Sequence, residues 1–323
     1  GVVTIPYSSN GVVINGGVNG SDARITMEVN GGQIAPTNTV TVNGPGFLLL
    51  AGNNILAGLN INNNGGTQGA LISSFQGDVT PGGADFGGTL TLNGNVNVTS
   101  SNPGGIARIA GRVDLGGTNR TFNVASTLWN GQDVSALLPA VDVQAALLGT
   151  AGLTKTGAGV LGFSAQNPYT GNTTVSAGTI AIVANPAGAF AGARNSRLDL
   201  VSATSYLNLN GANALFGSLR GTGTVTNASS TAGALFVGYD GTNSTFEGSF
   251  ARFSAAAANT LNITKIGTGN LTLTGTSTST GILIAGQGIL TYSGAANSLF
   301  ATNNVLDGGT LVLDNSGTNV NSR

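Results

Sequence analysis

The chain has 323 residues, of which 53 are glycine and only 7% are charged; its formal net charge is -1, and it has no cysteine or histidine. The near-zero charge removes the basic surface that nucleic acid or an anionic membrane requires. The missing thiols and imidazoles exclude disulfides, zinc sites and Ser-His-Asp chemistry. Ordinary soluble domains are roughly 25% charged, so the glycines and uncharged polar residues that replace charge here indicate an all-β protein.

Two further features concern membranes. The chain begins at Gly1 without a signal-peptide pattern, which predicts that such a peptide is missing or already removed. The most apolar stretch, residues 134–148, is interrupted by Pro139 and Asp142 and is too short to span a bilayer. We therefore expect no membrane insertion by this segment.

The first 87 residues contain short strand-like runs. They lie at residues 11–14 (Gly-Val-Val-Ile), 24–29 (Arg-Ile-Thr-Met-Glu-Val) and 40–42 (Val-Thr-Val). We predict that they form less regular coils of the fold that the following sequence indicates more clearly.

From residue 88 onward a pattern recurs of glycine, any residue, an aliphatic residue, any residue and a large apolar residue. It begins at Gly88, Gly111, Gly159, Gly178, Gly269, Gly288 and Gly309. The alternation is that of a half-buried strand, and we expect each leading glycine to supply a positive φ at a corner. The spacing is 19 residues both from Gly159 to Gly178 and from Gly269 to Gly288, whereas a propeller blade needs about 40.

This period predicts a parallel β-helix (β-solenoid). Each coil of about 20 residues, called a rung below, stacks on the next with equivalent strands in register. Inward aliphatic side chains are expected to form columns, and outward Thr, Ser and Asn side chains to form hydrogen-bonded ladders.

Two segments depart from the pattern. Residues 133–148 are expected to form a short helix with Asp133 as its N-cap, or an excursion from the coil. Residues 185–200 run longer than the equivalent segment later in the chain, which predicts a loop insertion at one edge.

The only two lysines identify a longer repeat. Lys155 and Lys265 are 110 residues apart, and at this offset residues 153–190 superpose on residues 263–300 without a gap. We expect both lysines at strand edges with their charges in water, where they discourage edge pairing, and a functional role is the alternative. The paired positions are Lys155 with Lys265, Gly157 with Gly267, Gly159 with Gly269, Leu161 with Leu271, Gly171 with Gly281, and Gly178 with Gly288.

Gly157, Gly159 and Gly162 also spell the Gly-x-Gly-x-x-Gly of a dinucleotide-binding loop. That loop binds phosphate only where it opens a helix, and Pro168 and Gly171 prevent a helix from running here. Gly162 falls on a threonine in the second copy, so the third glycine is not part of the repeat. We therefore disfavour a phosphate site.

Residues 152–161 (Gly-Leu-Thr-Lys-Thr-Gly-Ala-Gly-Val-Leu) and 167–180 (Asn-Pro-Tyr-Thr-Gly-Asn-Thr-Thr-Val-Ser-Ala-Gly-Thr-Ile) closely resemble the passenger-associated repeat of bacterial autotransporters. The copy at 263–290 is degenerate, with Ser279 in place of Tyr169. Weaker similarity extends over about residues 88–323. The resemblance implies a right-handed parallel β-helix at the surface of a Gram-negative-type bacterium or released from it. It also implies that residues 1–323 are one segment of a longer passenger.

Some parallel β-helices are polysaccharide lyases or hydrolases, which need clustered carboxylates. The acidic residues here are scattered. We interpret Arg112 and Asp114 as an exposed ion pair, with Arg108 or Arg120 nearby. The closest other pairs are Asp78 with Asp85, Asp133 with Asp142, and Asp307 with Asp314.

Residues 239–243 (Tyr-Asp-Gly-Thr-Asn) place oxygen ligands close together but lack the further acid of a calcium loop, so we favour an Asx turn. Trp129, Tyr169 and Tyr206 are candidates for stacking on sugars, although we favour packing in the core or at corners.

We therefore expect an exported, non-enzymatic rod that acts as an adhesin, spacer or stalk, with no catalytic, cofactor-binding or metal-binding residues. Its expected partners are a host or neighbouring-cell surface or glycans, and nucleic acid is not among them. Two alternatives remain: an extracellular filament that assembles end to end through its terminal rungs, and a polysaccharide-active enzyme.

Overall fold

The computed structural model describes residues 5–17, 23–27, 30–74, 88–136, 138–183, 190–252, 260–293 and 303–314. Every element formed by these residues is a β-strand. The chain divides into two compact units, residues 1–162 and 163–323. Among the described residues, no helix has the length and apolar character needed to cross a membrane.

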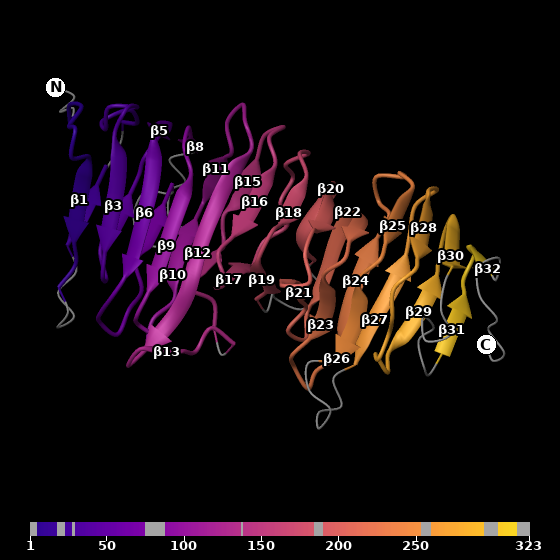
Figure 1. The fold of residues 1–323 in the computed structure, drawn as a ribbon. Helices are drawn as coiled ribbons and strands as arrows, with labels where there is room; N and C mark the ends of the chain where they lie inside the picture. Colours follow the sequence, from indigo (N-terminus) through magenta and orange to yellow (C-terminus); the bar gives the residue numbers. More distant parts are fainter. Residues whose placement is uncertain are drawn as a thin grey trace. The chain divides into compact units, whose positions relative to one another are not determined.

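The first unit is a coil whose complete rungs each contribute one strand to each of three parallel sheets (Figure 1). One complete rung consists of β3 (Thr39–Asn43), β4 (Phe47–Leu49) and β5 (Asn54–Leu56). The next consists of β6 (Gly58–Asn63), β7 (Leu71–Ser73) and β8 (Leu90–Leu92). Strands β9 (Val96–Ser100), β10 (Ala107–Ala110) and β11 (Arg112–Asp114) follow in the same order.

The remaining strands of this unit extend the same sheets, except β13, which pairs antiparallel with the end of β12. They are β1 (Val12–Asn15), β2 (Arg24–Thr26), β12 (Arg120–Trp129), β13 (Gln132–Asp133), β14 (Val141–Val143), β15 (Ala146–Leu148), β16 (Leu153–Thr156) and β17 (Val160–Phe163).

The second unit begins with β18 (Thr173–Val175), β20 (Ala191–Leu200) and the nine-residue β22 (Asn213–Gly221), which are parallel neighbours. Beyond β22 the sheet divides into two parallel stacks. One contains β24 (Gly233–Val237), β27 (Leu261–Lys265), β29 (Ile282–Ala285) and β31 (Asn303–Leu306). The other contains β25 (Ser244–Phe246), β28 (Asn270–Leu273), β30 (Ile289–Ser293) and β32 (Thr310–Asp314). A separate parallel sheet contains β19 (Gly178–Ile182), β21 (Ser205–Asn208), β23 (Thr224–Asn227) and β26 (Ser249–Arg252).

The parallel registers stack like residues on like residues, which confirms the predicted β-helix. In the first unit one core column consists of aliphatic side chains that are at most 4% exposed. Burying each side chain of this kind stabilises the fold by about 1.5–3 kcal/mol, so the column ties the rungs together along its length. Its members are Ile14, Val42, Ile61, Val98 and Val124.

The rung length varies more than the sequence period indicates. Leu271, Leu290 and Leu311 are register partners 19 and 21 residues apart, close to the predicted 20. In the first unit the distance along the chain ranges from 19 residues between Val40 and Leu59 to 37 residues between Leu59 and Val96. Loops inserted between strands account for the difference, because the strands themselves keep their register.

Where the structure describes the two irregular segments, the expected helix and the expected loop are wrong, whereas the alternative of an excursion from the coil holds for the β12–β13 hairpin at Asp133. Residues 133–136 and 138–148 contain no helix, and Asp133 lies in β13, paired antiparallel with β12. Residues 191–200 form strand β20 and not a loop; a register shift between Ala193 and Arg197 absorbs the extra length. Residues 184–189, and the repeat positions at 294–302, lie outside the described part of the chain.

The role expected for the leading glycines is only partly correct. Gly111, Gly178 and Gly288 have positive φ values of 93°, 72° and 62°. Gly159, in contrast, has no positive φ, and a Cβ there would stand 2.0 Å from the carbonyl oxygen of Ala125 in the preceding rung. Close contact between rungs explains this glycine, as it also does Gly88, Gly269 and Gly309.

Candidate functional site

Both lysines are buried and bind the turn that follows them. The Lys155 ammonium donates hydrogen bonds to the carbonyl oxygens of Thr156 (2.8 Å) and Gly157 (2.6 Å). The Lys265 ammonium does the same to Ile266 (2.6 Å) and Gly267 (2.8 Å). In each copy the lysine therefore bonds to the backbone of the next two residues, which form the corner after the strand.

The expectation that these lysines extend into water is wrong, since Lys155 is 0% and Lys265 1% exposed. Strand alternation explains the inward direction: Lys155 is two residues from the buried Leu153, and the intervening Thr154 faces outward. In the neighbouring rung Lys155 is the register partner of the buried Phe122. The lysine stems thus fill core positions, and their amines reach the corner.

Burial also shifts the ionisation of both amines. Loss of water lowers the pKa of Lys155 to about 7. Burial likewise lowers the pKa of Lys265, while the negative charge of Asp240 opposes that shift. A neutral amine still has two N–H donors, one for each of the corner carbonyl oxygens.

Arg120 is a third cation used in this way. It is 8% exposed and donates from Nε to the Leu115 carbonyl oxygen (2.6 Å) and from Nη1 to the Asn93 carbonyl oxygen (2.9 Å). Arg112 and Asp114 are half-buried in β11, and the Asp114 carboxylate accepts a 2.6 Å bond from the Gly116 N–H. In these contacts the charged side chains bond to backbone groups at the corners, and they do not bring carboxylates together as a catalytic site would.

The repeat glycines meet in successive turns of the second unit. A Cβ on Gly288 would stand 2.4 Å from the Gly267 carbonyl oxygen and 2.6 Å from that of Gly269. A Cβ on Gly281 would stand 1.8 Å from the Leu261 carbonyl oxygen. Leu161 and Leu271 are buried in the core, and Gly171 is half-buried in a bend. Gly162 lies within strand β17, and no helix follows in the described residues 163–183, so no helix opens at the phosphate-like motif.

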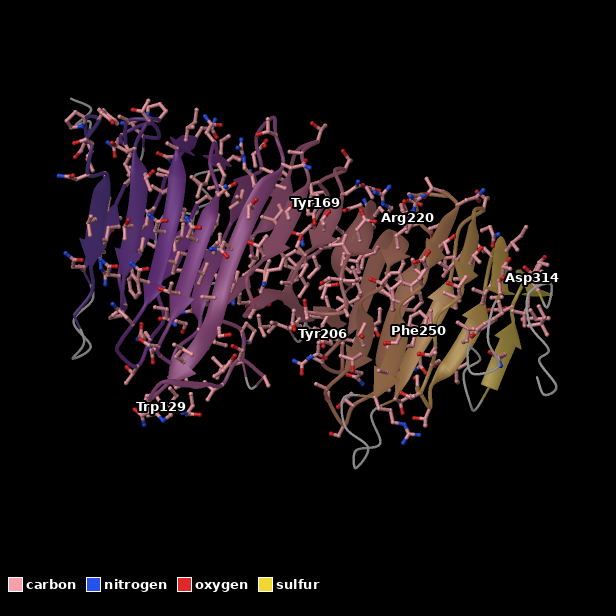
Figure 2. All side chains as sticks on the ribbon, viewed as in Figure 1. Trp129, Tyr169, Tyr206, Arg220, Phe250 and Asp314 are labelled. Atoms are coloured by element: carbon pink, nitrogen blue, oxygen red, sulfur yellow. The ribbon has the colours of Figure 1, made fainter. Side chains whose placement is uncertain are left out.

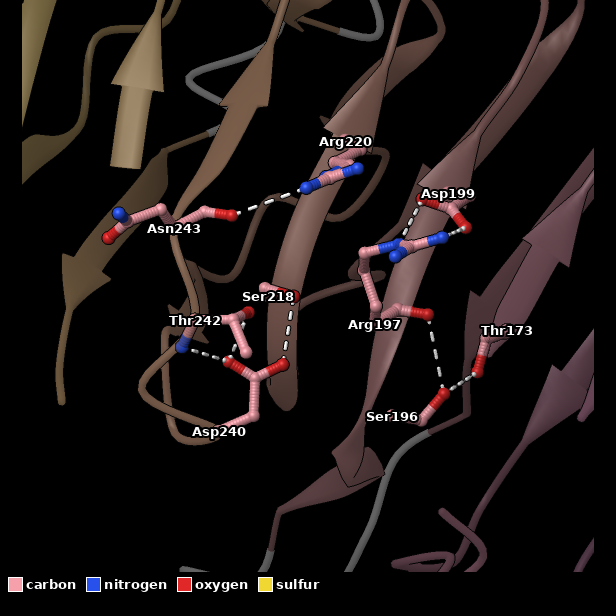
Figure 3. A network of polar contacts seen from close by, with 9 residues as sticks. All are labelled: Thr173, Ser196, Arg197, Asp199, Ser218, Arg220, Asp240, Thr242 and Asn243. Carbon is pink, nitrogen blue, oxygen red and sulfur yellow. Dashed lines mark hydrogen bonds and ion pairs between the residues drawn. The ribbon is translucent and has the colours of Figure 1, made fainter. Parts of the chain in front are cut away.

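The turn at residues 238–243 holds a polar network of the second unit (Figure 3). One Asp240 carboxylate oxygen accepts from the Thr242 N–H and hydroxyl at 2.9 and 2.8 Å. The other accepts from the Ser218 hydroxyl at 2.8 Å. This is the expected Asx turn, in which three donors already occupy the carboxylate. Groups of three or more metal-ligating side chains are not found among the described residues.

A second group of polar contacts lies in the neighbouring strands β18 and β20. Arg197 forms a two-point ion pair with Asp199, at 2.7 and 2.8 Å (Figure 3). Hydrogen bonding to Asp199 is the main cause that raises the pKa of Arg197, and Asp240 adds a smaller charge effect. Behind it the Ser196 hydroxyl is hydrogen-bonded to Thr173, which also contacts the Tyr169 hydroxyl.

The three aromatic candidates lie in different environments (Figure 2). Tyr169 is fully buried, and burial raises its pKa to about 12. Packing is therefore its role, as favoured from the sequence. Tyr206 is 37% and Trp129 53% exposed, so core packing is wrong for Trp129.

The other acidic candidates are bonded locally. The Asp133 carboxylate accepts from the Ser126 hydroxyl and the Ser135 N–H, which lower its pKa. Asp142 accepts from Gln144, and Asp314 from the Ser293 hydroxyl. Asp307 lies in the bend before β32. Asp78 and Asp85 lie outside the described residues.

The outer face of the first unit carries the predicted polar ladders. The Asn43 amide donates to Asn15 and the Asn62 amide donates to Asn43, both at 2.7 Å, and Thr99 donates to Asn62 at 3.0 Å. A second ladder two residues away joins Thr41, Asn60 and Asn97. The face is uncharged and repeats at the spacing of the strands, about 4.8 Å.

The family comparison agrees with the resemblance found in the sequence. Residues 153–182 match the passenger-associated-transport-repeat model, which covers 30 of the 323 residues. The comparisons with curated proteins and with solved structures gave no match. The matched segment begins at the strand that carries Lys155 and includes the Gly157 corner, so the buried lysine belongs to the repeat. The chain therefore carries the repeat of autotransporter passenger domains on a parallel β-helix.

Proposed function

We propose that this chain is a structural and adhesive segment of an exported cell-surface passenger, without enzymatic activity. The observation that carries the proposal is the combination of a passenger repeat with long, uncharged outer ladders on a stacked core. Backbone ladders and aliphatic columns make such a coil stiff, because each rung is held by its neighbours.

The described polar groups support a non-enzymatic role. Asp114, Asp133, Asp199 and Asp240 each bond to neighbours within their own turn, strand or adjacent rung. A glycosidase needs two carboxyl groups facing each other across an open site, and these four are used to hold turns and strands.

Cell-surface display is the first part of the test. Intact bacteria that make the full-length protein should bind an antibody raised against residues 1–323 as strongly as permeabilised cells do. Labelling only after permeabilisation would contradict the proposal.

Adhesion is the second part. Deleting the coding region for this segment should reduce attachment to host or neighbouring cells. Electron microscopy of the purified chain should show separate particles, since end-to-end polymers would favour the filament alternative. Sugar release from a panel of glycans would favour the enzyme alternative.

A further inference from the structure

One hairpin departs from the coil of the first unit. β12 runs past the end of β9 and returns as β13, the only antiparallel pair among the described strands (Figure 1). Its two-residue turn is Asn130-Gly131, with φ values of 49° and 76°. These are the left-handed conformations of a type I′ turn, whose twist matches that of the flanking strands.

Hydrogen bonds at its base hold the hairpin in place. The Ser126 hydroxyl donates to the Asp133 carboxylate at 2.7 Å, and the same carboxylate accepts the Ser135 N–H at 2.9 Å. The Ser135 hydroxyl accepts the Thr127 N–H, and the Val134 N–H donates to the Thr127 carbonyl oxygen, both at 2.8 Å. A site on this hairpin is therefore ordered before any ligand arrives.

The tip presents the only tryptophan of the chain. Trp129, labelled in Figure 2, is 53% exposed. It is directly opposite Gln132, so the two side chains lie on the same face of the hairpin. Within the described part of the chain, the indole N–H and the Asn130 and Gln132 amides make no side-chain hydrogen bond. An aromatic ring next to unused amide donors and acceptors is thus open to solvent.

We propose that the Trp129 hairpin is a binding site for an uncharged polysaccharide. The indole offers a flat apolar surface to the C–H face of a sugar ring, and the Gln132 and Asn130 amides offer donors and acceptors to its hydroxyl groups. Tryptophan gives a large contact area at a small cost in side-chain entropy, particularly on a rigid hairpin.

Charge favours a neutral ligand. The hairpin's charged group is Asp133, whose low pKa keeps it ionised. Asp133 is paired with Leu128, so its carboxylate lies on the opposite face of the hairpin from Trp129 and Gln132 and leaves the ring face uncharged. As the one charge of this small hairpin it still disfavours the approach of anionic polysaccharides and anionic lipid head groups, and it is costly to bury in a bilayer. The neighbouring ladder face of β9 and β12 is also uncharged, with Asn97 and Asn123 exposed as register partners. A neutral chain thus meets no repulsion on the hairpin or beside it.

Fluorescence of the single tryptophan provides a direct test. The purified 323-residue chain is titrated with dextran, laminarin, yeast mannan and xyloglucan as neutral probes, and with alginate, heparin and phosphatidylglycerol vesicles as anionic ones. At least one neutral polymer should change the emission saturably, and the anionic probes should not.

Affinity electrophoresis in gels containing that polymer tests the residues. Trp129→Ala should weaken retardation about tenfold or more, as expected when an aromatic anchor is removed. Gln132→Ala should weaken it about threefold, and Trp129→Phe should retain part of it. Tyr206→Ala, which removes another exposed aromatic ring, is the matched control and should bind like the unmodified chain. Unchanged far-ultraviolet circular dichroism would show that each variant is folded.

Three outcomes would overturn the inference: no neutral polymer binds, Trp129→Ala binds like the unmodified chain, or an anionic probe is preferred. The inference rests on the proposed surface function for its biological setting, yet the two fail separately. A chain displayed on intact cells that binds no neutral polymer refutes only the glycan site. A chain that binds one but stays inside the cell refutes only the surface role.

Discussion

Lys155 donates a 2.6 Å hydrogen bond to the carbonyl oxygen of Gly157, two residues further along the chain. The second copy of the repeat keeps the same contact between Lys265 and Gly267, at 2.8 Å. The lysine stem fills a core position next to its register partner Phe122, and the amine donates to the corner carbonyl oxygens of Thr156 and Gly157. The lysine thus acts as an internal cap on the strand.

Replacing this cap should destabilise the first unit. Lys155→Met keeps the apolar stem but leaves the carbonyl oxygens of Thr156 and Gly157 without their buried donor, which typically costs about 1–3 kcal/mol. Urea denaturation followed by circular dichroism measures the loss. Thr154→Ala, on the outer face of the same strand, should change stability by less than about 0.5 kcal/mol. Equal effects from the two variants would contradict the capping role.

The same side chain should make stability depend on pH. Burial lowers the pKa of Lys155 to about 7, whereas a lysine in an unfolded chain titrates near 10.4. Between these values the unfolded chain binds more protons than the folded one. The free energy of unfolding therefore rises as the pH rises from about 7 to about 10, by at most about 1.4 kcal/mol per pH unit. Below pH 7 this contribution is constant.

Comparing the unmodified chain with Lys155→Met isolates the effect, because all other titrating groups are shared. The difference between their unfolding free energies, measured at several pH values from 6 to 10, should change with pH above 7. Parallel curves over that range would mean that Lys155 stays protonated in the fold.

Substitution by alanine should be tolerated at some corner glycines and not at others, depending on whether the added Cβ meets the neighbouring rung. Gly159→Ala places a Cβ 2.0 Å from the Ala125 carbonyl oxygen, and separating the rungs to make room should cost about 3 kcal/mol or more. Gly117→Ala is the matched control, since nothing lies within 4 Å of its added Cβ. It should be neutral or slightly stabilising. Thermal unfolding midpoints distinguish the two, and a tolerated Gly159→Ala would refute the close approach.

The hydrogen bonds of the outer asparagine ladder should stabilise the fold, in addition to forming the polar surface. Asn43 donates to Asn15 and accepts from Asn62, so Asn43→Ala removes two hydrogen bonds at once. The expected loss is about 1–2 kcal/mol. Thr121→Ala, another outward change in the same sheet, has no such pair of partners and serves as the control. Hydrogen exchange of the β3 and β6 amides would locate the effect, and unchanged exchange would argue against a structural ladder.

The sequence predicts the regular part of this fold well because its signal is local. The patterns that begin at Gly269, Gly288 and Gly309 correspond to β28, β30 and β32. In β28 the pattern appears as buried Leu271 and Leu273 alternating with Asn270 and Thr272, and in β30 Leu290 and Tyr292 are buried on either side of Thr291. Insertions between strands leave this alternation intact, so the strands are recognisable although rung lengths are not.

The candidate site was harder to predict because the usual preference of a residue type can oppose the position that the strand pattern gives it. A lysine is normally assigned to the surface, yet in Leu153-Thr154-Lys155 the alternation with Leu153 already indicates an inward direction. At the hairpin, the Asn130-Gly131 dipeptide is a strong turn signal. The loss of the repeat pattern after Asp133 favoured a helix instead. The contacts that decide both cases are local, since Lys155 binds the carbonyl oxygens of the next two residues and the hairpin is closed by bonds such as Ser126 to Asp133.

The distance between Thr272 and Thr291 tests the coiled arrangement most directly. These outward residues are 19 positions apart in sequence and are register partners in adjacent rungs, and Thr245 is the partner of Thr272 on its other side. Because the chain has no cysteine, nitroxide labels can be attached to cysteines introduced at chosen pairs. Electron paramagnetic resonance should show strong dipolar broadening for 272 with 291 and for 245 with 272, and weaker broadening for 245 with 291. Equal or absent broadening in the three pairs would contradict a parallel stack of rungs.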